Sequence, residues 1–472
     1  MENKTVKNLL FIISGLLLFA YVIWRAYFLS FTHDESLTYS IISENSGWKY
    51  TTNNHFFNTT LIELCQNLFG KSEFIFRLPN VLAFVLYFIG FFYLMRPVKN
   101  ICIVILGMAI VLLNPFLLDF FSLARGYGLS FAFMMLSMYF LLRDSFKNIS
   151  YRRFLFNFGF SMLWASLSLY SNFGAMNFYI ACFGIFIAVY LYQYFKKTDI
   201  SYRKPLRFII LAAIFLIPLF LGIKRLFLLE ELNELYHGTN NFHHTIDSFI
   251  YGSFYWHQYP HWVFISIKYM LIFLIPAGAT LVILKKDFFG ELSITLLLLS
   301  LILLGFFLEY FLFHANYPWE RTTLFFAPII GLVAVYMALH INNFNSFIAK
   351  TNSLIISVVS FCLMAHFLVS ANLTYTQTWK YDSHTKEVMK YVKENIPEDG
   401  NKRTISNEWL FEPTINFYIN IWNIPLHKTD RKGVNVNTDF IYRINNYDEW
   451  EGYQVVMSFA DTLSELLEAD KN

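Results

Sequence analysis

The hydrophobic positions of the chain fall into long runs separated by short polar connections. Each run has about 20 residues, the length that an α-helix needs to cross a hydrocarbon core about 30 Å thick. We therefore predict an all-α polytopic membrane protein with about eleven transmembrane helices. The runs cover residues 9–30, 78–95, 101–119, 126–142, 154–171, 174–195, 207–226, 262–284, 292–313, 323–340 and 352–370.

The basic residues alternate between the two sides of the predicted bundle. One set of connections is rich in Lys and Arg, and the other set is poor in them. Because short cytoplasmic connections hold an excess of these residues, the basic set is predicted to be cytoplasmic. The N-terminus then lies in the cytoplasm, and an odd number of spans places the C-terminus outside. The basic set comprises Lys4 and Lys7, Arg96 and Lys99, Arg143 to Arg153, Lys196 to Arg207, Lys285 and Lys286, and Lys350.

Three segments on the predicted outer side are long enough to fold. The first outer loop, about residues 31–77, mixes aromatic and polar residues, and its residues 60–70 (TLIELCQNLFG) are typical of an interfacial amphipathic helix. The second segment, residues 227–261, is rich in His, Tyr and Trp. The third is a charged and polar tail, residues 372–472, which follows the transmembrane part, residues 1–371.

The tail is predicted to form a small soluble α/β domain on the outer side. Its pattern indicates helices over residues 383–394 and 413–422, and strands over residues 403–407, 440–444 and 453–459. About 100 residues with this mixture of elements suit one small domain.

Composition agrees with the hydrophobic pattern. The 472 residues are 56% hydrophobic and 15% charged, whereas a soluble protein has about a quarter charged residues. The net charge of +3 says little about partners, because the basic residues are distributed by topology. The expected partners include membrane lipids and no nucleic acid. No A-x-A-like cleavage site follows the first run, which is predicted to be a retained helix. The four cysteines show no metal-ligand spacing; no metal site is assigned, and a need for a divalent metal stays open.

Charged residues stand at the outer ends of three predicted spans, at the depth of the lipid headgroups. Ionisable residues beside a bilayer are costly and count as candidate site residues. A carboxylate can deprotonate an incoming hydroxyl or amine, and a guanidinium can bind phosphate through its planar fork of donors. A transferase with a lipid-linked phosphate donor needs both, since the leaving phosphate requires charge neutralisation more than protonation. The residues are Asp34 and Glu35, Arg125, and Glu320 and Arg321.

These motifs resemble those of the C-type polytopic membrane glycosyltransferases, the group of protein O-mannosyltransferases and lipid A aminoarabinose transferases. The likeness covers about residues 8–339. It rests on an acidic pair after the first span, a loop histidine, an arginine at the start of the second span, an Ala-Arg-x-Tyr element, and a late arginine before a proline-containing helix. In this chain the motifs are Asp34-Glu35, Asn53-Asn54-His55, Arg77-Leu78-Pro79, Ala124-Arg125-Gly126-Tyr127, and Arg321 with Pro328.

The resemblance implies sugar transfer from a polyprenyl-phosphate-linked donor to a glycan, lipid or protein acceptor, with inversion at the anomeric carbon. It places this reaction on the outer face of a bacterial inner membrane. Asp34 would be the catalytic base, and Glu35 would orient it or tune it, because two adjacent carboxylates predict a raised pKa for one of them. Arg125 and Arg321 would neutralise the donor phosphate. The remaining implied substrate-binding positions are His55, Arg77, Tyr127 and Glu320.

Other interpretations stay open from the sequence. Asp34 and Glu35 also suit a solvated loop start that caps the next helix, and Arg125 also suits an arginine that reaches phospholipid headgroups. Arg321 also suits an ion pair with Glu320. Lys224 and Arg225 suit interfacial anchors, and the histidines of residues 237–261 suit an interfacial loop better than a metal site.

Two functions of other classes compete with sugar transfer. A transporter or lipid flippase would place ionisable residues near the middle of the bilayer and often has two related halves, and the sequence offers neither clearly. A non-catalytic scaffold that binds a partner through the tail is the third interpretation.

Overall fold

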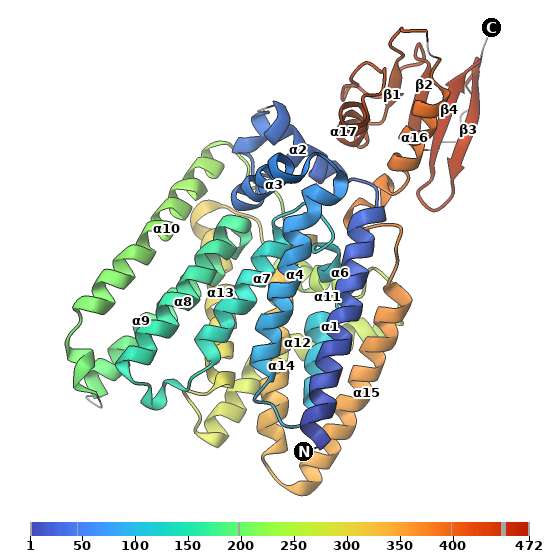
Figure 1. The fold of residues 1–472 in the computed structure, drawn as a ribbon. Coiled ribbons are helices and arrows are strands. Elements are labelled where there is room, and N and C mark those ends of the chain that lie inside the picture. Colours follow the sequence, from blue (N-terminus) through green and yellow to red (C-terminus); the bar gives the residue numbers. More distant parts are fainter. Residues whose placement is uncertain (1, 45, 197–198, 398, 445–449, 471–472) are drawn as a thin grey trace.

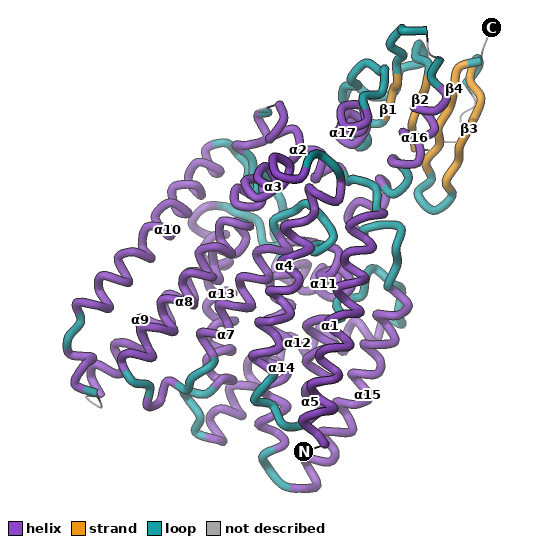
Figure 2. Tube along the Cα trace, viewed as in Figure 1, coloured by secondary structure: helices purple, strands orange, loops and turns teal. Residues whose placement is uncertain are grey.

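The described part of the chain forms a helical bundle with a small α/β unit at one end (Figure 1). The computed structural model describes residues 2–44, 46–196, 199–397, 399–444 and 450–470. Lys197, in one of the predicted basic connections, lies outside these residues. The α/β unit stands at the end of the bundle opposite the N-terminus, beside the helices of the first loop (Figure 1). Figure 2 shows the strands gathered in this unit.

The bundle helices follow the predicted apolar runs, which confirms the all-α polytopic fold. Among the described residues, eight helices have the length and hydropathy for a membrane crossing. They include α1 (Glu2–Phe28), α4 (Glu73–Met95), α9 (Met176–Lys196), α10 (Leu206–Glu231), α12 (His261–Lys285), α13 (Glu291–Phe313), α14 (Phe326–Asn342) and α15 (Ser346–Ser370). The other predicted runs hold α5 (Ile101–Gly107) with its π-helical turn (Met108–Leu112), α7 (Tyr127–Leu142) and α8 (Tyr151–Ser171).

The predicted span over residues 101–119 is interrupted before its end. The π-helical turn ends at Leu112, and Asn114 caps a new short helix, α6 (Pro115–Asp119), by accepting the Leu117 N–H at 3.1 Å. Pro115 suits the first turn of that helix, because a backbone N–H at this position would have no intrahelical acceptor and proline therefore loses no hydrogen bond. After this interruption the chain continues through the connection of residues 120–126, which contains Arg125.

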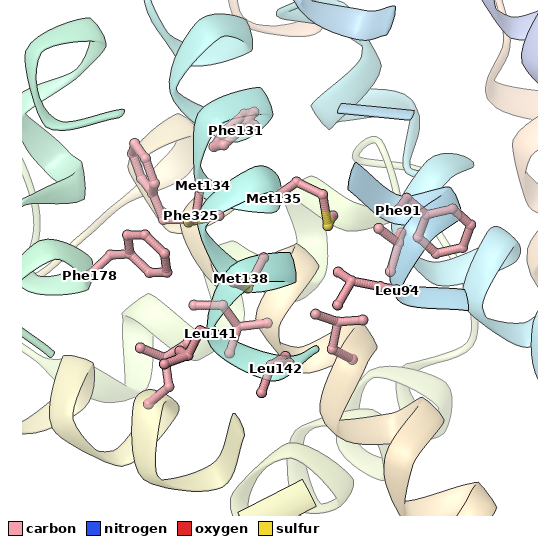
Figure 3. Close-up of a cluster of buried hydrophobic side chains, with 14 of the residues drawn as sticks. Phe91, Leu94, Phe131, Met134, Met135, Met138, Leu141, Leu142, Phe178 and Phe325 are labelled. Atoms are coloured by element: carbon pink, nitrogen blue, oxygen red, sulfur yellow. The ribbon is translucent and has the colours of Figure 1, made fainter. Parts of the chain in front are cut away.

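The helix α7 is buried on nearly all sides. Its sequence is apolar all round, as expected of a helix inside a bundle. Hydroxyl pairs tie it to α8, with Oγ–Oγ distances of 2.9 Å between Ser130 and Ser168 and 3.0 Å between Ser137 and Ser161. Figure 3 shows its side chains interdigitating with those of α4, α9 and the turn before α14, among them Met134, Met135, Phe91, Leu94, Phe178 and Phe325.

Two helices of the first loop lie across the end of the bundle, and α2 (His33–Glu44) begins with the acidic pair. The predicted amphipathic helix is confirmed as α3 (Phe56–Phe69), which starts four residues before the predicted boundary. It ends at Gly70, whose φ of +87° lies in the region that glycine tolerates best. The segment of residues 227–261, the second one predicted to lie outside, contains α11 (Phe242–Ser253).

The tail has the predicted helices and strands and one strand more. Its helices are α16 (Thr385–Asn395) and α17 (Glu412–Trp422), and its described strands are β1 (Ile405–Asn407), β2 (Phe440–Ile444), β3 (Tyr453–Phe459) and β4 (Ser464–Ala469). The described strands pair in the order β1-β2-β4-β3, with β1 parallel to β2 and the other pairs antiparallel. The sequence did not predict β4, because SELLEA favours a helix; its central position in the sheet overrides that preference.

The tail packs directly on the segment that leads into α2. The Phe31 and Phe417 rings stack with centroids 3.9 Å apart, and the Phe31 N–H donates to the Tyr418 hydroxyl at 2.8 Å. Lys386 forms an ion pair with Glu73 at the start of α4. The hydrophobic core of the tail therefore continues into the first loop. The domain boundary at residues 371 and 372 stays a prediction.

Candidate active site

The Asp34 carboxylate lies between two guanidinium groups. Its Oδ2 atom is 3.5 Å from the nearest nitrogen of Arg125 and 3.4 Å from that of Arg321. The three residues come from the first turn of α2, the connection between α6 and α7, and the short 3₁₀ turn Glu320–Phe325 before α14. Asp34 is only 7% exposed, so the interpretation of a solvated loop start is wrong.

The guanidinium groups set the protonation of Asp34. Burial raises the pKa of this carboxyl, but Arg125 and Arg321 outweigh burial, and the net pKa lies below its usual value. The expectation of a pKa raised by the adjacent carboxylate is therefore wrong for Asp34. Successive helix residues point about 100° apart, and Glu35 faces a cation of its own. Asp34 is ionised at neutral pH.

Glu35 is held in a closed hydrogen-bond network. The Arg77 guanidinium donates to both of its carboxylate oxygens, at 2.8 and 2.7 Å, and both side chains are fully buried. The Thr32 N–H and hydroxyl donate to Oε2 at 3.0 and 3.1 Å, and the Ala124 N–H donates to Oε1 at 2.6 Å. Glu35 thus joins the start of α2, the start of α4 and the connection that carries Arg125.

Arg77 uses all of its donors inside the protein. Besides Glu35, it donates to the carbonyl oxygens of Ala26, Leu29 and Ser30 at 2.8 to 3.1 Å. These contacts satisfy carbonyl oxygens at the end of α1, and the guanidinium of Arg77 is fully buried. The sequence assignment of Arg77 to substrate binding is therefore not supported by its geometry, which is that of a structural clamp.

Arg125 is fixed by the first loop. One of its terminal nitrogens donates to the Asp34 carbonyl, the Thr38 hydroxyl and the Asn53 carbonyl, at 3.1 to 3.2 Å, and the other donates to Asn53 Oδ1 at 2.5 Å. Its Nε is buried and has no hydrogen-bond partner among the described residues. Gly126 allows this approach, because a Cβ atom there would lie 1.9 Å from the Ser171 carbonyl oxygen. Arg125 is not a headgroup-seeking surface arginine.

Arg321 is the more accessible of the two cations. Its side chain is 19% exposed, compared with 1% for Arg125. Tyr127 interacts with it electrostatically, and its guanidinium carbon lies 5.4 Å from the centroid of the Trp379 ring. The preceding residue, Glu320, has a φ of +49° and donates its N–H to Ser248 Oγ at 2.6 Å. This strained backbone is held by α11 and sets the direction of Arg321.

Glu320 belongs to the electrostatic surroundings of the site. Burial and Arg321 hold the pKa of His237 below its ordinary value, and the Glu320 carboxylate opposes that shift. Glu320 therefore lies within electrostatic range of His237, a residue of the second outer segment. Arg321 pairs with Asp34 in this arrangement, so its interpretation as a simple partner of Glu320 is incomplete.

His55 forms one wall of a cavity next to the ion cluster. Its ring packs edge-on against Tyr127 with centroids 5.3 Å apart. Burial and the guanidinium groups of Arg125, Arg225 and Arg321 hold its pKa well below the usual range, so the ring is neutral. Its Nε2 and the Nε of Arg225 are buried without hydrogen-bond partners among the described residues. Both residues line a cavity of about 230 Å³ whose other walls include Leu169, Tyr170, Phe173 and Leu221.

Two residues beside the ion cluster were not predicted from the sequence: Trp379 faces Arg321, and Asp382 accepts the N–H of His33, the residue before Asp34. Trp379 and Asp382 come from the 3₁₀ segment Gln377–Asp382, and both are buried. A run of aromatic and charged residues directly after the last span (QTWKYD) was the available signal. Among the described residues, no group of three or more His, Cys, Asp or Glu side chains is arranged to hold a metal ion.

Comparison with known proteins identifies the fold. No protein-family model matches the chain, and no curated protein sequence matches it. Two solved structures share its fold: ArnT from Cupriavidus metallidurans bound to undecaprenyl phosphate, and the same protein in the apo state. Each aligns over 98% of this chain and 98% of ArnT, with a TM-score of 0.54 and 10% sequence identity. The fold implied by the resemblance to the C-type glycosyltransferases is confirmed.

Proposed function

We propose that the protein is a membrane glycosyltransferase that takes a sugar from a polyprenyl-phosphate-linked donor. The observation that carries this proposal is the Asp34 carboxylate held between Arg125 and Arg321 at the end of the bundle opposite the N-terminus. One acid and two guanidinium groups are the groups that a transfer away from a phosphate requires. The fold of ArnT, which binds undecaprenyl phosphate, supports the donor class.

In the proposed reaction, Asp34 accepts the proton of an acceptor hydroxyl or amine. The acceptor atom forms a bond to the anomeric carbon while the bond from that carbon to the phosphate oxygen breaks, and the phosphate leaves with the electron pair. A single displacement inverts the configuration at the anomeric carbon. The leaving phosphate gains negative charge, which Arg321 and Arg125 neutralise.

Donor binding also makes Asp34 a better base. In the free protein, both guanidinium groups hold the pKa of Asp34 down and make the carboxylate a weak base. Arg321 is partly exposed, and those of its donors that do not face Asp34 can bind a phosphate. Once the phosphate shares Arg321, Asp34 loses part of the field of one cation and its pKa rises. Proton transfer is then favoured only when the donor is present.

The cavity beside His55 is suited to the phosphate end of the donor. Arg225 points its guanidinium there over the Phe173 ring, at 5.9 Å, and donates to the carbonyl oxygens of Thr51 and Asn54. The unpartnered nitrogens of His55 and Arg225 are donors or acceptors that a bound polar group would satisfy. The apolar walls suit the first units of a polyprenyl chain.

Glu35 and Arg77 have a positioning role in this proposal. Their bidentate pair fixes the first turn of α2 against the connection that carries Arg125, and so keeps Asp34 in register with both cations. The site faces the outer side of a bacterial inner membrane, and the acceptor is a glycan, lipid or protein there. Transport is not proposed, because the charged groups gather at one end of the bundle.

The test is to delete the gene, to reintroduce the wild-type or a variant gene, and to compare cell-envelope glycans and glycoproteins by mass spectrometry. A strain without the protein should lose one sugar modification, and the wild-type gene should restore it. D34N should fail to restore it while it is expressed and inserted normally, with a loss of about 100-fold or more. D399N removes an exposed tail carboxylate and serves as the matched control. Restoration by D34N would refute Asp34 as the base.

A further inference from the structure

The tail reaches into the ion cluster through one short segment, Gln377–Asp382. Trp379 in this segment is 4% exposed and lies between two partners. On one side its ring is 5.4 Å from the guanidinium carbon of Arg321, and on the other it meets the Phe120 ring edge-on with centroids 6.1 Å apart. A guanidinium beside an aromatic face is attracted by the ring and held parallel or close to it.

This contact restricts the cation that faces Asp34. Arg321 reaches Asp34 with one terminal nitrogen at 3.4 Å and is partly open to solvent. A long side chain at such a position would otherwise explore several rotamers. Trp379 leaves the guanidinium a narrow range of orientations.

The segment also holds the start of the helix that carries Asp34. Asp382 is fully buried, and its Oδ2 accepts the N–H of His33 at 2.7 Å. The His33 Nδ1 is 2.7 Å from the Leu410 carbonyl oxygen, which also belongs to the tail. The first residue of α2 is therefore fastened to the tail through its backbone and its ring.

The position of the segment is set by a second buried network. Arg25 in α1 forms an ion pair of 2.5 Å with Asp119 in α6 and donates to the Tyr375 carbonyl at 2.7 Å. Asp119 accepts the Gln377 N–H at 2.9 Å and the Tyr255 hydroxyl at 3.0 Å. Residues 375–377 are thus anchored to the bundle directly before Trp379, so the tail cannot shift without breaking buried hydrogen bonds.

We propose that Trp379 and Asp382 are positioning residues of the glycosyltransferase site. Trp379 fixes the plane of Arg321 against Asp34, and Asp382 fixes the start of α2 so that Asp34 faces both cations. The tail is then a structural part of the site. This inference rests on the proposed function for its purpose, but the geometry it describes can be measured without any sugar.

The experiment follows the protonation of Asp34 in the purified full-length protein. Carbodiimides modify protonated carboxyl groups, so the pH midpoint of modification at Asp34, read by peptide mass spectrometry, reports its pKa. The wild-type midpoint should lie below the ordinary value of an aspartate carboxyl group, since both cations favour the ionised form. R321Q should raise the midpoint by about one unit or more, and W379L should raise it in the same direction because Arg321 is no longer held.

Conservative variants separate positioning from simple loss of structure. W379F keeps an aromatic face and should shift the midpoint less than W379L does. D382N keeps an acceptor for the His33 N–H and should behave like the wild type, whereas D382L should raise the midpoint. W262L removes a tryptophan on α12 that is 69% exposed and should leave the midpoint unchanged. Each variant is compared at equal monodispersity and thermal stability.

The outcomes distinguish this inference from the proposed function. If R321Q shifts the midpoint at Asp34 but W379L and D382L have the wild-type midpoint, the positioning role is overturned. Sugar transfer is not affected by that result. If the midpoints shift as expected but deletion of the protein changes no envelope glycan, the positioning role stands and the proposed transferase function is overturned. An unshifted R321Q would overturn the pairing on which both depend.

Discussion

The Arg77 guanidinium binds the Glu35 carboxylate through two hydrogen bonds, of 2.8 and 2.7 Å, inside the junction of α1, α2 and α4. Neither side chain has any exposed surface. Such a pair contributes little to stability relative to two apolar groups, but the loss of one partner leaves a buried charge uncompensated.

We expect E35Q to lower the free energy of unfolding by about 3 to 5 kcal/mol, because Arg77 would keep its charge without a counter-ion. The measurement is thermal or denaturant unfolding of the protein in detergent. The double variant E35L/R77L removes both charges and should recover part of this loss. Equal stability of E35Q and the wild type would contradict the role of Glu35 as the partner of Arg77.

Neutral His55 gives the protein a stability that depends on pH. Burial, Arg125, Arg225 and Arg321 hold the folded pKa of His55 well below the unfolded value of about 6.5. Between these two values the unfolded state binds the proton and the folded state does not. This contribution is therefore complete above about pH 6.5 and falls with decreasing pH, by about 1.4 kcal/mol per unit.

The variant H55Q should reduce the pH dependence of unfolding below about pH 6.5, since a glutamine side chain at this position does not protonate. A series of melting temperatures from pH 7.5 down to 5 would measure the effect. H243Q replaces an exposed histidine on α11 and should retain the wild-type slope. An unchanged slope in H55Q would show that the pKa of His55 is not lowered in the folded protein.

Gly126 permits a close contact rather than an unusual backbone conformation. Its φ of −63° is open to any residue, but a Cβ atom would lie 1.9 Å from the Ser171 carbonyl oxygen and 2.7 Å from the Cβ of His55. We expect G126A to cost about 3 kcal/mol or more and to displace Arg125. G184A on α9, where a Cβ atom would meet nothing within 4 Å, should change stability by less than about 1 kcal/mol.

The cavity beside His55 predicts a binding phenotype for Arg225. Undecaprenyl phosphate added to the purified protein should bind about tenfold more weakly to R225Q than to the wild type, since a charge-assisted hydrogen bond is lost. K224Q removes the same charge from the exposed neighbouring residue and should bind normally. Microscale thermophoresis or native mass spectrometry can measure both, and equal losses in the two variants would point to general electrostatic attraction.

Prediction from the sequence was most accurate where the signal is local. The predicted runs match the bundle helices, because the length of an apolar run and its flanking charges depend on neighbouring residues alone. It was less accurate at residues 101–119, where Asn114 and Pro115 start a new helix. It did not predict β4, whose residues adopt a strand only through pairing with β2 and β3 on both sides.

The candidate site was predicted in part. Asp34, Arg125 and Arg321 are charged residues at the ends of apolar runs, where a lipid-facing helix would avoid a charge. Their positions in the sequence alone therefore single them out. Glu35 and Arg77 carry the same kind of signal, but their geometry is that of a clamp. The run QTWKYD marks Trp379 as an interfacial aromatic residue, but nothing local in the sequence shows that it faces Arg321.

The sequence by itself determined that this chain is a polytopic helical protein with ionisable groups at the ends of its spans, because bilayer thickness and desolvation act on each segment separately. Only the tertiary structure decided which carboxylate meets which guanidinium. Glu35 and Arg77 are 42 residues apart, and Asp34 and Arg125 are 91 apart. Such partners are chosen by how the helices pack, and a one-residue rotation of α2 would have exchanged the two acids.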